Sequence, residues 1–217
     1  MIKAVLFDLD GTLINSLEDL AASTNFALAR FGFPLKNNIE DFKYFIGDGM
    51  YKLIERVLPE DKREDGIITQ VLAVFMEHYS THYLDKTHAY NKIVPLVNAI
   101  SGKGFKMAVV SNKAEHMAVI ITKKIFGDVF DTICGKREGY PAKPDPSLTL
   151  EVINELGVEP QECYFVGDSG MDMKVAVNAG CIGVGVTWGF RGREELLHNG
   201  ALHIVNDPEE ILALLKG

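Results

Sequence analysis

The chain has 217 residues, 47% of them hydrophobic and 24% charged, which is the composition of a folded globular protein with one core or two small ones. Its formal net charge of -8 at pH 7 argues against a nucleic acid or an anionic membrane as partner, because both are bound by basic patches. Any phosphate that it binds must therefore meet a few local positive charges or a metal ion.

The three cysteines, Cys134, Cys163 and Cys181, are odd in number, distant in sequence and embedded in apolar segments. This pattern predicts buried free thiols rather than a disulfide framework or a zinc cluster, and it fits a reducing cytoplasm. The apolar start is interrupted at Asp8, unlike a signal peptide, and no apolar run is long enough to span a bilayer. We therefore expect a cytoplasmic protein without a membrane partner.

The first predicted element is a short strand over residues 4–8, followed closely by Asp10 and Gly11. A continuous apolar run suits a strand that is covered on both faces, as in a parallel sheet, and such sheets bind ligands outside the carboxyl ends of their strands. Asp8 and Asp10 therefore lie where chemistry is expected. Taken alone, the two aspartates could equally begin a polar turn.

An all-helical insert follows this strand. Residues 15–83 show only helical periodicity, whereas strand-like and helical runs alternate in the later part of the chain. The capping pattern Ser16-x-x-Asp19 predicts the start of the first helix of the insert. The contrast predicts an α/β core over residues 1–14 and 84–217, with a helical cap domain over residues 15–83.

Two histidines in the insert, His78 and His82, have the i, i+4 spacing of neighbours on a helix. A zinc site needs at least a third ligand, and the sequence offers none beside them. We interpret them as an exposed pair on the cap rather than as a metal site.

Further strands are predicted where short apolar runs separate helical segments. With the first strand, they cover residues 4–8, 106–111, 132–135, 163–167, 182–186 and 202–205. Alternating strands and helices build a parallel sheet with helices on both faces. The predicted fold is therefore α/β, a doubly wound, Rossmann-like parallel sheet with the helical cap inserted after its first strand.

The strand over residues 106–111 ends in Ser111 and Asn112, just before a helical run over residues 114–126. A hydroxyl, an amide and the first amides of a helix together suit a phosphoryl oxygen. The alternative is that one of the two side chains only caps the helix.

Lys143 lies between Pro141 and Pro144, immediately ahead of a helix over residues 147–156. A lysine held in a stiff segment at a helix start can neutralise an anion at little entropic cost. The alternative is a solvated surface lysine, the common state of this residue type.

Asp168 and Asp172 follow the strand over residues 163–167, and they share one helix face if the helix begins at Asp168. With Asp8 and Asp10, up to four carboxylates then converge on one edge of the sheet. At an effective dielectric near 20, each like-charge pair about 4 Å apart costs roughly 4 kcal/mol, which a bound cation would relieve. Hard oxygen ligands that stay open to a phosphate favour Mg2+ over zinc.

The four stretches around Asp8, Ser111, Lys143 and Asp168, in this order, resemble the haloacid dehalogenase superfamily of phosphohydrolases. The insert after the first stretch is similar to the small helical cap of one of its subgroups. Three shorter stretches resemble phosphoglycolate phosphatases and their pyrophosphatase relatives: Asn15-Ser16-x-x-Asp19-Leu20, Gly47-Asp48-Gly49 and Thr187-Trp188-Gly189-Phe190-Arg191.

The resemblance implies a role for each residue of the site. Asp8 would be the nucleophile that becomes an aspartyl phosphate, and Asp10 the general acid and base. The implied ligands of Mg2+ are Asp8, the main-chain carbonyl of Asp10, Asp168 and, as a ligand or as a partner of one, Asp172.

The implied phosphate-binding residues are Ser111, Asn112 and Lys143. The cap would close over a small phosphorylated metabolite, with Gly47, Asp48 and Gly49 as a candidate contact loop. The expected substrate is 2-phosphoglycolate, and the expected assembly is a monomer or a homodimer.

Other functions stay open at this point. A pyrophosphatase or another small-metabolite phosphatase would keep the same chemistry. A sugar phosphomutase would also keep Asp8 and Asp10, but mutases with this cap typically carry a histidine where this chain has Leu20. A phosphoryl-accepting signalling domain combines similar residues, yet its phosphorylated aspartate lies on a later strand and it has no helical insert of this size. A haloacid dehalogenase proper needs neither Asp10 nor a metal.

Overall fold

The computed structural model describes residues 1–216 and divides the chain into two units. The core unit joins Met1–Ile14 to the chain from Ala89 onward, and the helical unit is Asn15–His88. Two short strands, β2 (Ile14–Asn15) and β3 (His88–Ala89), pair where the chain passes from one unit to the other.

The core unit contains a six-stranded sheet in the order β5-β4-β1-β6-β7-β8. Every neighbouring pair is parallel, which confirms the doubly wound α/β fold. The strands are β1 (Ala4–Phe7), β4 (Lys106–Ala114), β5 (Thr132–Lys136), β6 (Cys163–Gly167), β7 (Ile182–Val186) and β8 (His203–Val205). Strand β4 continues beyond the predicted end at residue 111, so Ser111 and Asn112 lie within it.

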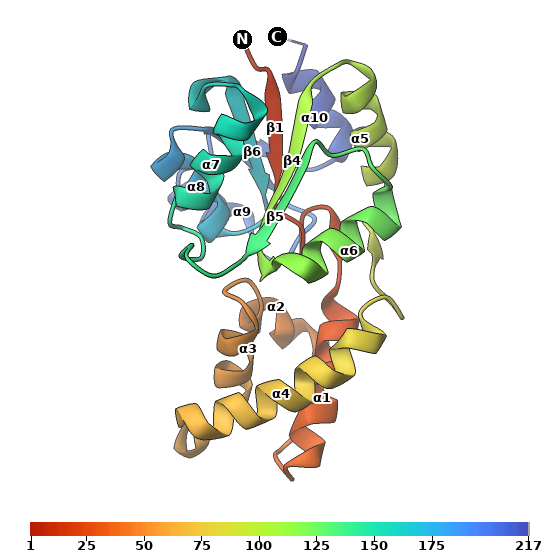
Figure 1. The fold of residues 1–217 in the computed structure, drawn as a ribbon, viewed down its shortest axis with the longest axis vertical. Helices are drawn as coiled ribbons and strands as arrows, with labels where there is room; N and C mark the ends of the chain where they lie inside the picture. Colours follow the sequence, from red (N-terminus) through yellow and green to blue (C-terminus); the bar gives the residue numbers. More distant parts are fainter. Residues whose placement is uncertain (217) are drawn as a thin grey trace. The chain divides into compact units, whose positions relative to one another are not determined.

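Helices cover both faces of this sheet. Figure 1 shows α7 and α8 on one side and α5 and α6 on the other. The helices of the core unit are α5 (Ile93–Gly102), α6 (Glu115–Phe126), α7 (Ser147–Leu156), α8 (Gly170–Ala179), α9 (Arg193–His198) and α10 (Pro208–Leu214), with the 3-10 turn η3 (Pro160–Glu162) before β6.

The apolar run of β1 explains its place in the middle of the sheet. All four of its residues are fully buried. Ala4 and Leu6 pack with Val152 of α7 and Val175 of α8, whereas the ring of Phe7 contacts Phe130 edge to face at 6.2 Å. Alternate side chains thus serve opposite faces of the sheet, as expected for a strand buried on both sides.

The helical unit contains α1 (Leu17–Arg30), η1 (Ile39–Asp41), α2 (Phe42–Phe45), α3 (Met50–Val57), η2 (Glu60–Lys62) and α4 (Asp65–His82). Helix α4 packs against both α1 and α3. Large side chains such as Leu20, Leu53, Phe75 and Tyr79 are buried in this unit.

The start of α1 differs from the predicted capping pattern. Ser16 stands at the N-cap, but its side chain makes no capping hydrogen bond. Asp19 instead accepts hydrogen bonds from the main-chain amides of Lys86 and Thr87, at 3.0 and 2.8 Å. These bonds hold residues 84–88, which are predicted from sequence to lie in the core, within the helical unit.

His78 and His82 stack on each other in α4, with ring centroids 4.1 Å apart. His82 is exposed, but His78 is only partly so, because it also contacts Ser23 and the ring of Phe26. Within residues 1–216, neither histidine belongs to a group of three or more potential metal ligands.

The three cysteines are buried free thiols, as predicted. They all belong to the core unit, and Cys163 and Cys181 lie next to each other at the start of β6 and just before β7. Among residues 1–216, no helix has both the length and the apolar character needed to cross a membrane.

Candidate active site

The site lies where the three central strands end. Phe7 of β1 pairs with Val109 of β4 and Val166 of β6, and the amide of Asp8 donates to the carbonyl of Val166 at 2.9 Å. Because the strands are parallel, the residues that follow them meet at one edge of the sheet. Asp8 and Asp168 come to this edge because they follow β1 and β6, and Ser111 comes to it two residues after Val109 within β4.

Lys143 joins two carboxylates at this edge. Its ammonium donates to Oδ1 of Asp8 and to Oδ1 of Asp172, both at 2.7 Å, and to the carbonyl of Val110 at 3.0 Å. The side chain is 6% exposed, which rules out a solvated surface lysine. All three donors of the ammonium are therefore used inside the protein.

Burial sets the charge balance of the cluster. Burial raises the pKa of Asp8 to about 7, an effect that Lys143 offsets only in part. Burial, reinforced by the charges of Asp172 and Asp8, also raises the pKa of Asp168 well above its ordinary value. For Lys143 burial lowers the pKa, but Asp172 and Asp8 outweigh it and hold this pKa above its ordinary value. Burial thus disfavours the charged forms of Asp8 and Asp168, which a bound cation would favour.

Asp168 accepts hydrogen bonds from two other segments, one that contains Thr12 and one that contains Phe190. Thr12 Oγ1 donates to its Oδ1 at 3.2 Å, and the amide of Phe190 donates to its Oδ2 at 2.7 Å. A Cβ on Gly11 or on Gly189 would lie 2.3 Å from Asp168. Both segments can approach this carboxylate only because glycine stands at these two positions.

Asp172 has a different environment from the predicted one. Helix α8 begins at Gly170 rather than at Asp168, because Ser169 caps it and Asp172 accepts in return from the Ser169 amide at 3.0 Å. Asp168 therefore precedes the helix, and the two carboxylates do not share a helix face. Since Oδ1 of Asp172 binds Lys143 and Oδ2 binds Ser169, both of its oxygens are engaged by protein donors.

Three of the four aspartates can share a cation. Ligand atoms of Asp8, Asp168 and Asp172 all lie within 4.8 Å of one another, and all three residues are buried. Lys143 offsets one of these three charges, so the cluster retains the charge that one divalent cation would neutralise. An all-oxygen donor set fits a hard ion such as Mg2+.

The Asp10 carboxylate lies outside this group of three. Its two oxygens bind the ammonium of Lys113, at 3.1 and 3.0 Å. The four predicted carboxylates thus divide into a metal-compatible set of three and one that is paired separately with a lysine.

Ser111 and Asn112 make different contacts. Neither caps α6, whose N-cap is Ala114. The Ser111 hydroxyl accepts from the Lys113 amide at 3.3 Å and keeps its own hydrogen for donation. The Asn112 side chain accepts from the Lys143 amide at 2.8 Å and so holds the main chain that carries the central lysine.

Several residues contribute to the site without a role predicted from sequence. Thr12 follows Gly11 in the stretch after the first strand, Gly189 and Phe190 lie in a stretch used only for the resemblance, and Lys113 follows Asn112 directly. Tyr90 is another, because burial together with the charges of Asp168 and Asp10 raises its pKa. A lysine at a predicted strand end is the one signal that could have singled out Lys113.

The predicted contact loop lies in the helical unit. Asp48 forms an ion pair with Arg56 of α3. Gly47 and Gly49 adopt positive φ angles of 119° and 89°, which glycine tolerates best. The loop is therefore a defined turn at the start of α3.

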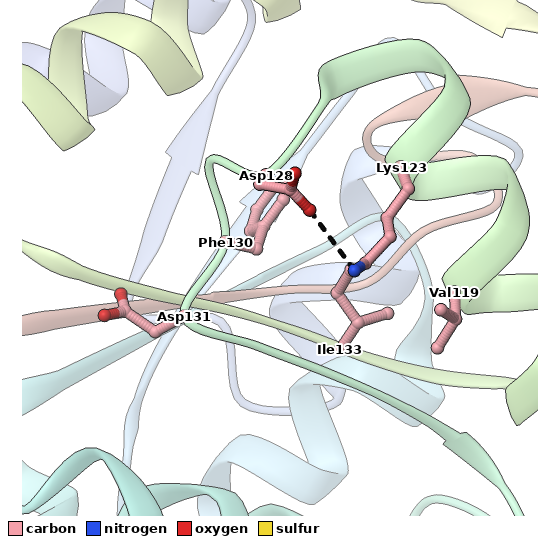
Figure 2. Close-up of a pocket in the computed structure, with 6 residues that line it drawn as sticks. All are labelled: Val119, Lys123, Asp128, Phe130, Asp131 and Ile133. Atoms are coloured by element: carbon pink, nitrogen blue, oxygen red, sulfur yellow. Dashed lines mark ion pairs between the residues drawn. The ribbon is translucent and has the colours of Figure 1, made fainter.

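A separate shallow pocket of about 200 Å³ lies on the core unit beside α6 and the segment leading into β5 (Figure 2). Lys123 and Asp128 form an ion pair across it at 3.2 Å. The residues that line it are Val119, Lys123, Asp128, Phe130, Asp131 and Ile133. None of them belongs to the carboxylate and lysine cluster, so the pocket adds nothing to the chemistry.

Comparison with known proteins gives a consistent result. Residues 5–186 match the family model of haloacid dehalogenase-like hydrolases. The chain is 33% identical to phosphoglycolate phosphatase 1 of Pseudomonas aeruginosa over 97% of its own length and 78% of the relative. It is 32% identical to phosphoglycolate phosphatase of Haemophilus influenzae, over 98% of each chain.

Solved structures share the fold. A crystal structure from Lactobacillus delbrueckii subsp. bulgaricus superposes with a TM-score of 0.93, at 30% identity and over 98% of each chain. CbbY from Rhodobacter sphaeroides, solved in complex with phosphate, gives a TM-score of 0.83 over 100% of each chain. At 22% identity, the latter likeness concerns the fold alone.

Proposed function

Because the chain belongs to the haloacid dehalogenase-like hydrolase family and is a phosphoric monoester hydrolase, we propose that it hydrolyses 2-phosphoglycolate with Mg2+ through an aspartyl phosphate on Asp8. The observation that carries this proposal is the cluster at the end of β1, where Lys143 bridges Asp8 and Asp172 beside Asp168. A buried carboxylate next to a lysine and a cation site is equipped to attack phosphorus and to balance the charge of the transferred group.

In the first half-reaction, a carboxylate oxygen of Asp8 forms a bond to phosphorus while the bond from phosphorus to the ester oxygen breaks. The electron pair of the broken bond goes to the leaving oxygen, and Asp10 gives that oxygen a proton. The products are glycolate and the phosphorylated Asp8.

In the second half-reaction, water attacks the same phosphorus and the bond to Asp8 breaks. Asp10 takes up the proton that the water loses, so both aspartates return to their starting state. The sum is one ester and one water consumed, and one alcohol and one phosphate formed.

The other residues of the site would bind the phosphoryl group and neutralise its charge. The Ser111 hydroxyl would donate to an oxygen of the transferred phosphoryl group. Lys143 would neutralise the charge of this group and donate to it with the hydrogen that binds Asp8 before the transfer, and Asn112 contributes by holding the Lys143 main chain. Mg2+, when bound, would neutralise charge on the phosphoryl oxygens. Its ligands would be Asp8, the Asp10 carbonyl and Asp168. Asp172, whose oxygens are both engaged by Lys143 and Ser169, would orient Lys143 rather than serve as the main ligand.

The choice of 2-phosphoglycolate is supported by the relatives, which are phosphoglycolate phosphatases, since the contacts proposed for the site concern only the phosphoryl group. The three buried free thiols further favour a reducing cytoplasm as the working compartment.

Phosphate release from a panel of compounds tests the proposal. The purified protein is assayed with 2-phosphoglycolate, pyrophosphate, sugar phosphates and nucleotides, with Mg2+ and with a chelator. The same preparation of Asp8→Asn measures any contaminating phosphatase. We expect release only with Mg2+ and the highest kcat/KM for 2-phosphoglycolate.

A preference for pyrophosphate or another ester would keep the chemistry and change the substrate. An isomerised sugar phosphate without phosphate release would instead indicate a mutase. A stable phosphoprotein after incubation with acetyl phosphate would indicate a phosphoryl-storing protein.

A further inference from the structure

Lys113 is a second buried lysine at the edge of the sheet, with a side chain 1% exposed. Its ammonium reaches both oxygens of Asp10, at 3.1 and 3.0 Å, and the Asp10 side chain is itself 12% exposed. A lysine is rarely buried to this degree without a partner. The Asp10 carboxylate is an acidic group that it contacts.

Main-chain contacts fix the position of the Lys113 backbone. Its amide donates to the Ser111 hydroxyl at 3.3 Å, and the pairing of β4 with β5 changes register between Val110 and Ala114. On the β5 side, a Cβ on Gly135 would lie 2.5 Å from the Lys113 carbonyl. The close passage of β5 leaves Lys113 little freedom to shift.

The two lysines of the site divide the aspartates between them. Lys143 uses its three donors on Asp8, Asp172 and the Val110 carbonyl. It therefore has none left for Asp10. Asp8 and Asp10 are only two residues apart, yet each is bound by a different ammonium, and the arrangement keeps the two carboxylates apart in function.

We propose that Lys113 is a positioning residue that orients the Asp10 carboxylate toward the leaving oxygen and the attacking water. The inference rests on the proposed function, in which Asp10 carries the proton. A carboxylate rotates freely about its last bond unless both oxygens are held. The contact of one ammonium with both oxygens restricts that rotation and so favours one geometry for proton transfer.

Leaving-group dependence separates this role from simple stabilisation. An alkyl ester such as 2-phosphoglycolate needs a proton on its leaving oxygen, whereas p-nitrophenolate departs without one. The value of kcat/KM reports the steps up to departure of the leaving group. A misdirected Asp10 therefore lowers kcat/KM for the alkyl ester and spares it for the aryl ester, while a general loss of folded enzyme lowers both equally.

The experiment compares Lys113→Met, Asp10→Asn and the wild type on 2-phosphoglycolate and on p-nitrophenyl phosphate with Mg2+. For Lys113→Met we expect kcat/KM to fall by about 10²-fold for the alkyl ester and by much less for the aryl ester. With the aryl ester, a burst of about one p-nitrophenolate per site is expected, because hydrolysis of the phosphorylated Asp8 also needs Asp10.

The matched control is Lys106→Met. Lys106 is on the same strand and binds Asp131 at 2.8 Å, but its side chain is 52% exposed and lies at the opposite end of β4. This variant should leave kcat/KM unchanged for both esters. Equal losses on the two esters for Lys113→Met, or no loss on either, would overturn the inference.

If Lys113→Met fails to fold, the double variant with Asp10→Asn removes both partners of the buried pair at once. Compared with Asp10→Asn alone, it should lose no further kcat/KM on either ester, and a further loss would contradict the inference. Absence of hydrolysis by the wild type would defeat the proposed function. Hydrolysis without the expected selectivity in the variants would defeat the role of Lys113 alone.

Discussion

The end of the sheet and the helical unit differ in how deeply their charged side chains are buried. At the sheet edge, five charged groups that belong to the site are buried: Asp8, Lys113, Lys143, Asp168 and Asp172. Lys143 pairs with Asp8 and Asp172, and Lys113 pairs with Asp10. In the helical unit, both side chains of a pair such as Lys62 with Asp61 are exposed. Exposed pairs contribute roughly 0–1 kcal/mol each, whereas removing one partner of a buried pair costs several kcal/mol.

Glycine shows the same contrast. A Cβ on Gly11, Gly167 or Gly189 would lie within 2.3 Å of an aspartate of the site. A Cβ on Gly32 or Gly66 in the helical unit would meet nothing within 4 Å. The sheet edge is thus constrained sterically as well as electrostatically. Constraints that do not serve packing are characteristic of sites selected for chemistry at some cost in stability.

The largest expected effect tests whether the chemistry belongs to the sheet edge. Asp8→Asn removes the nucleophile, and activity should fall by more than about 10⁴-fold, the scale seen when an enzyme loses such a group. Thermal unfolding should remain cooperative, because asparagine has the same shape and still accepts from Lys143. The measurement is phosphate release together with a melting curve.

Asp131→Asn is the matched control, since Asp131 lies just before β5 and pairs with the exposed end of Lys106. It should retain activity. An active Asp8→Asn enzyme would end the covalent mechanism.

The steric side of the comparison is tested next. Gly189→Ala would place a Cβ 2.3 Å from Asp168 and from the Gly11 carbonyl, so the carboxylate or the loop must move. Displacing a group that supports a metal ligand typically costs about 10- to 100-fold in metal affinity or activity. We expect the Mg2+ concentration needed for half-maximal activity to rise, and kcat to fall, by a factor of this size.

Gly192→Ala is the control in the same loop, because a Cβ there meets nothing within 4 Å. If the two alanine variants behaved alike, close packing around Asp168 would not be what positions this carboxylate.

Asp19 is the exception in the helical unit and gives a smaller effect. It is a buried carboxylate, 3% exposed, that accepts from the main-chain amides of Lys86 and Thr87 and from the Thr87 hydroxyl. Asp19→Asn turns an amide N–H₂ toward these donors, which should destabilise the unit by about 2–4 kcal/mol. Hydrogen exchange at Lys86 and Thr87 is the direct measurement.

Glu18→Gln changes the exposed neighbour in the same helical turn and should leave that exchange rate unchanged. Slow exchange in Asp19→Asn would show that packing alone holds residues 84–88 in the helical unit.

The convergence of the candidate site residues follows from strand ends. Asp8, Ser111 and Asp168 each come directly after a buried apolar run, and parallel strands bring their ends to one edge. Periodicity and the all-apolar run of β1 are local features, so the sheet and its order of elements could be expected without coordinates.

The remaining contacts depend on how particular side chains compete and how distant segments approach each other. The condition under which Asp168 and Asp172 would share a helix face is not met, because Ser169 and Asp172 form a capping box that places the start of α8 at Gly170. Asp19 does not take part in the predicted capping pattern but accepts a hydrogen bond from the amide of Lys86, 67 residues away in sequence. The Lys113 contact with Asp10 and the close passage of Gly189 by Asp168 likewise join residues far apart in the chain, which local patterns do not encode.

The smallest expected effect is at a glycine of the helical unit, and the same substitution at the sheet edge should have the opposite sign. Gly66 is the second residue of α4, and a Cβ added there would meet nothing within 4 Å. Gly66→Ala should therefore stabilise the protein by up to about 1 kcal/mol through the higher helix propensity of alanine. Gly167→Ala would place its Cβ 2.2 Å from the Cβ of Asp172 and should destabilise the protein.

Urea unfolding of both variants measures the difference in the free energy of unfolding. Since the substitution is the same, opposite signs would show that the surroundings of the glycine, rather than its chain entropy, set the result at the sheet edge. A destabilised Gly66→Ala would remove the contrast, because alanine would then be unfavourable even where no neighbouring atom opposes it.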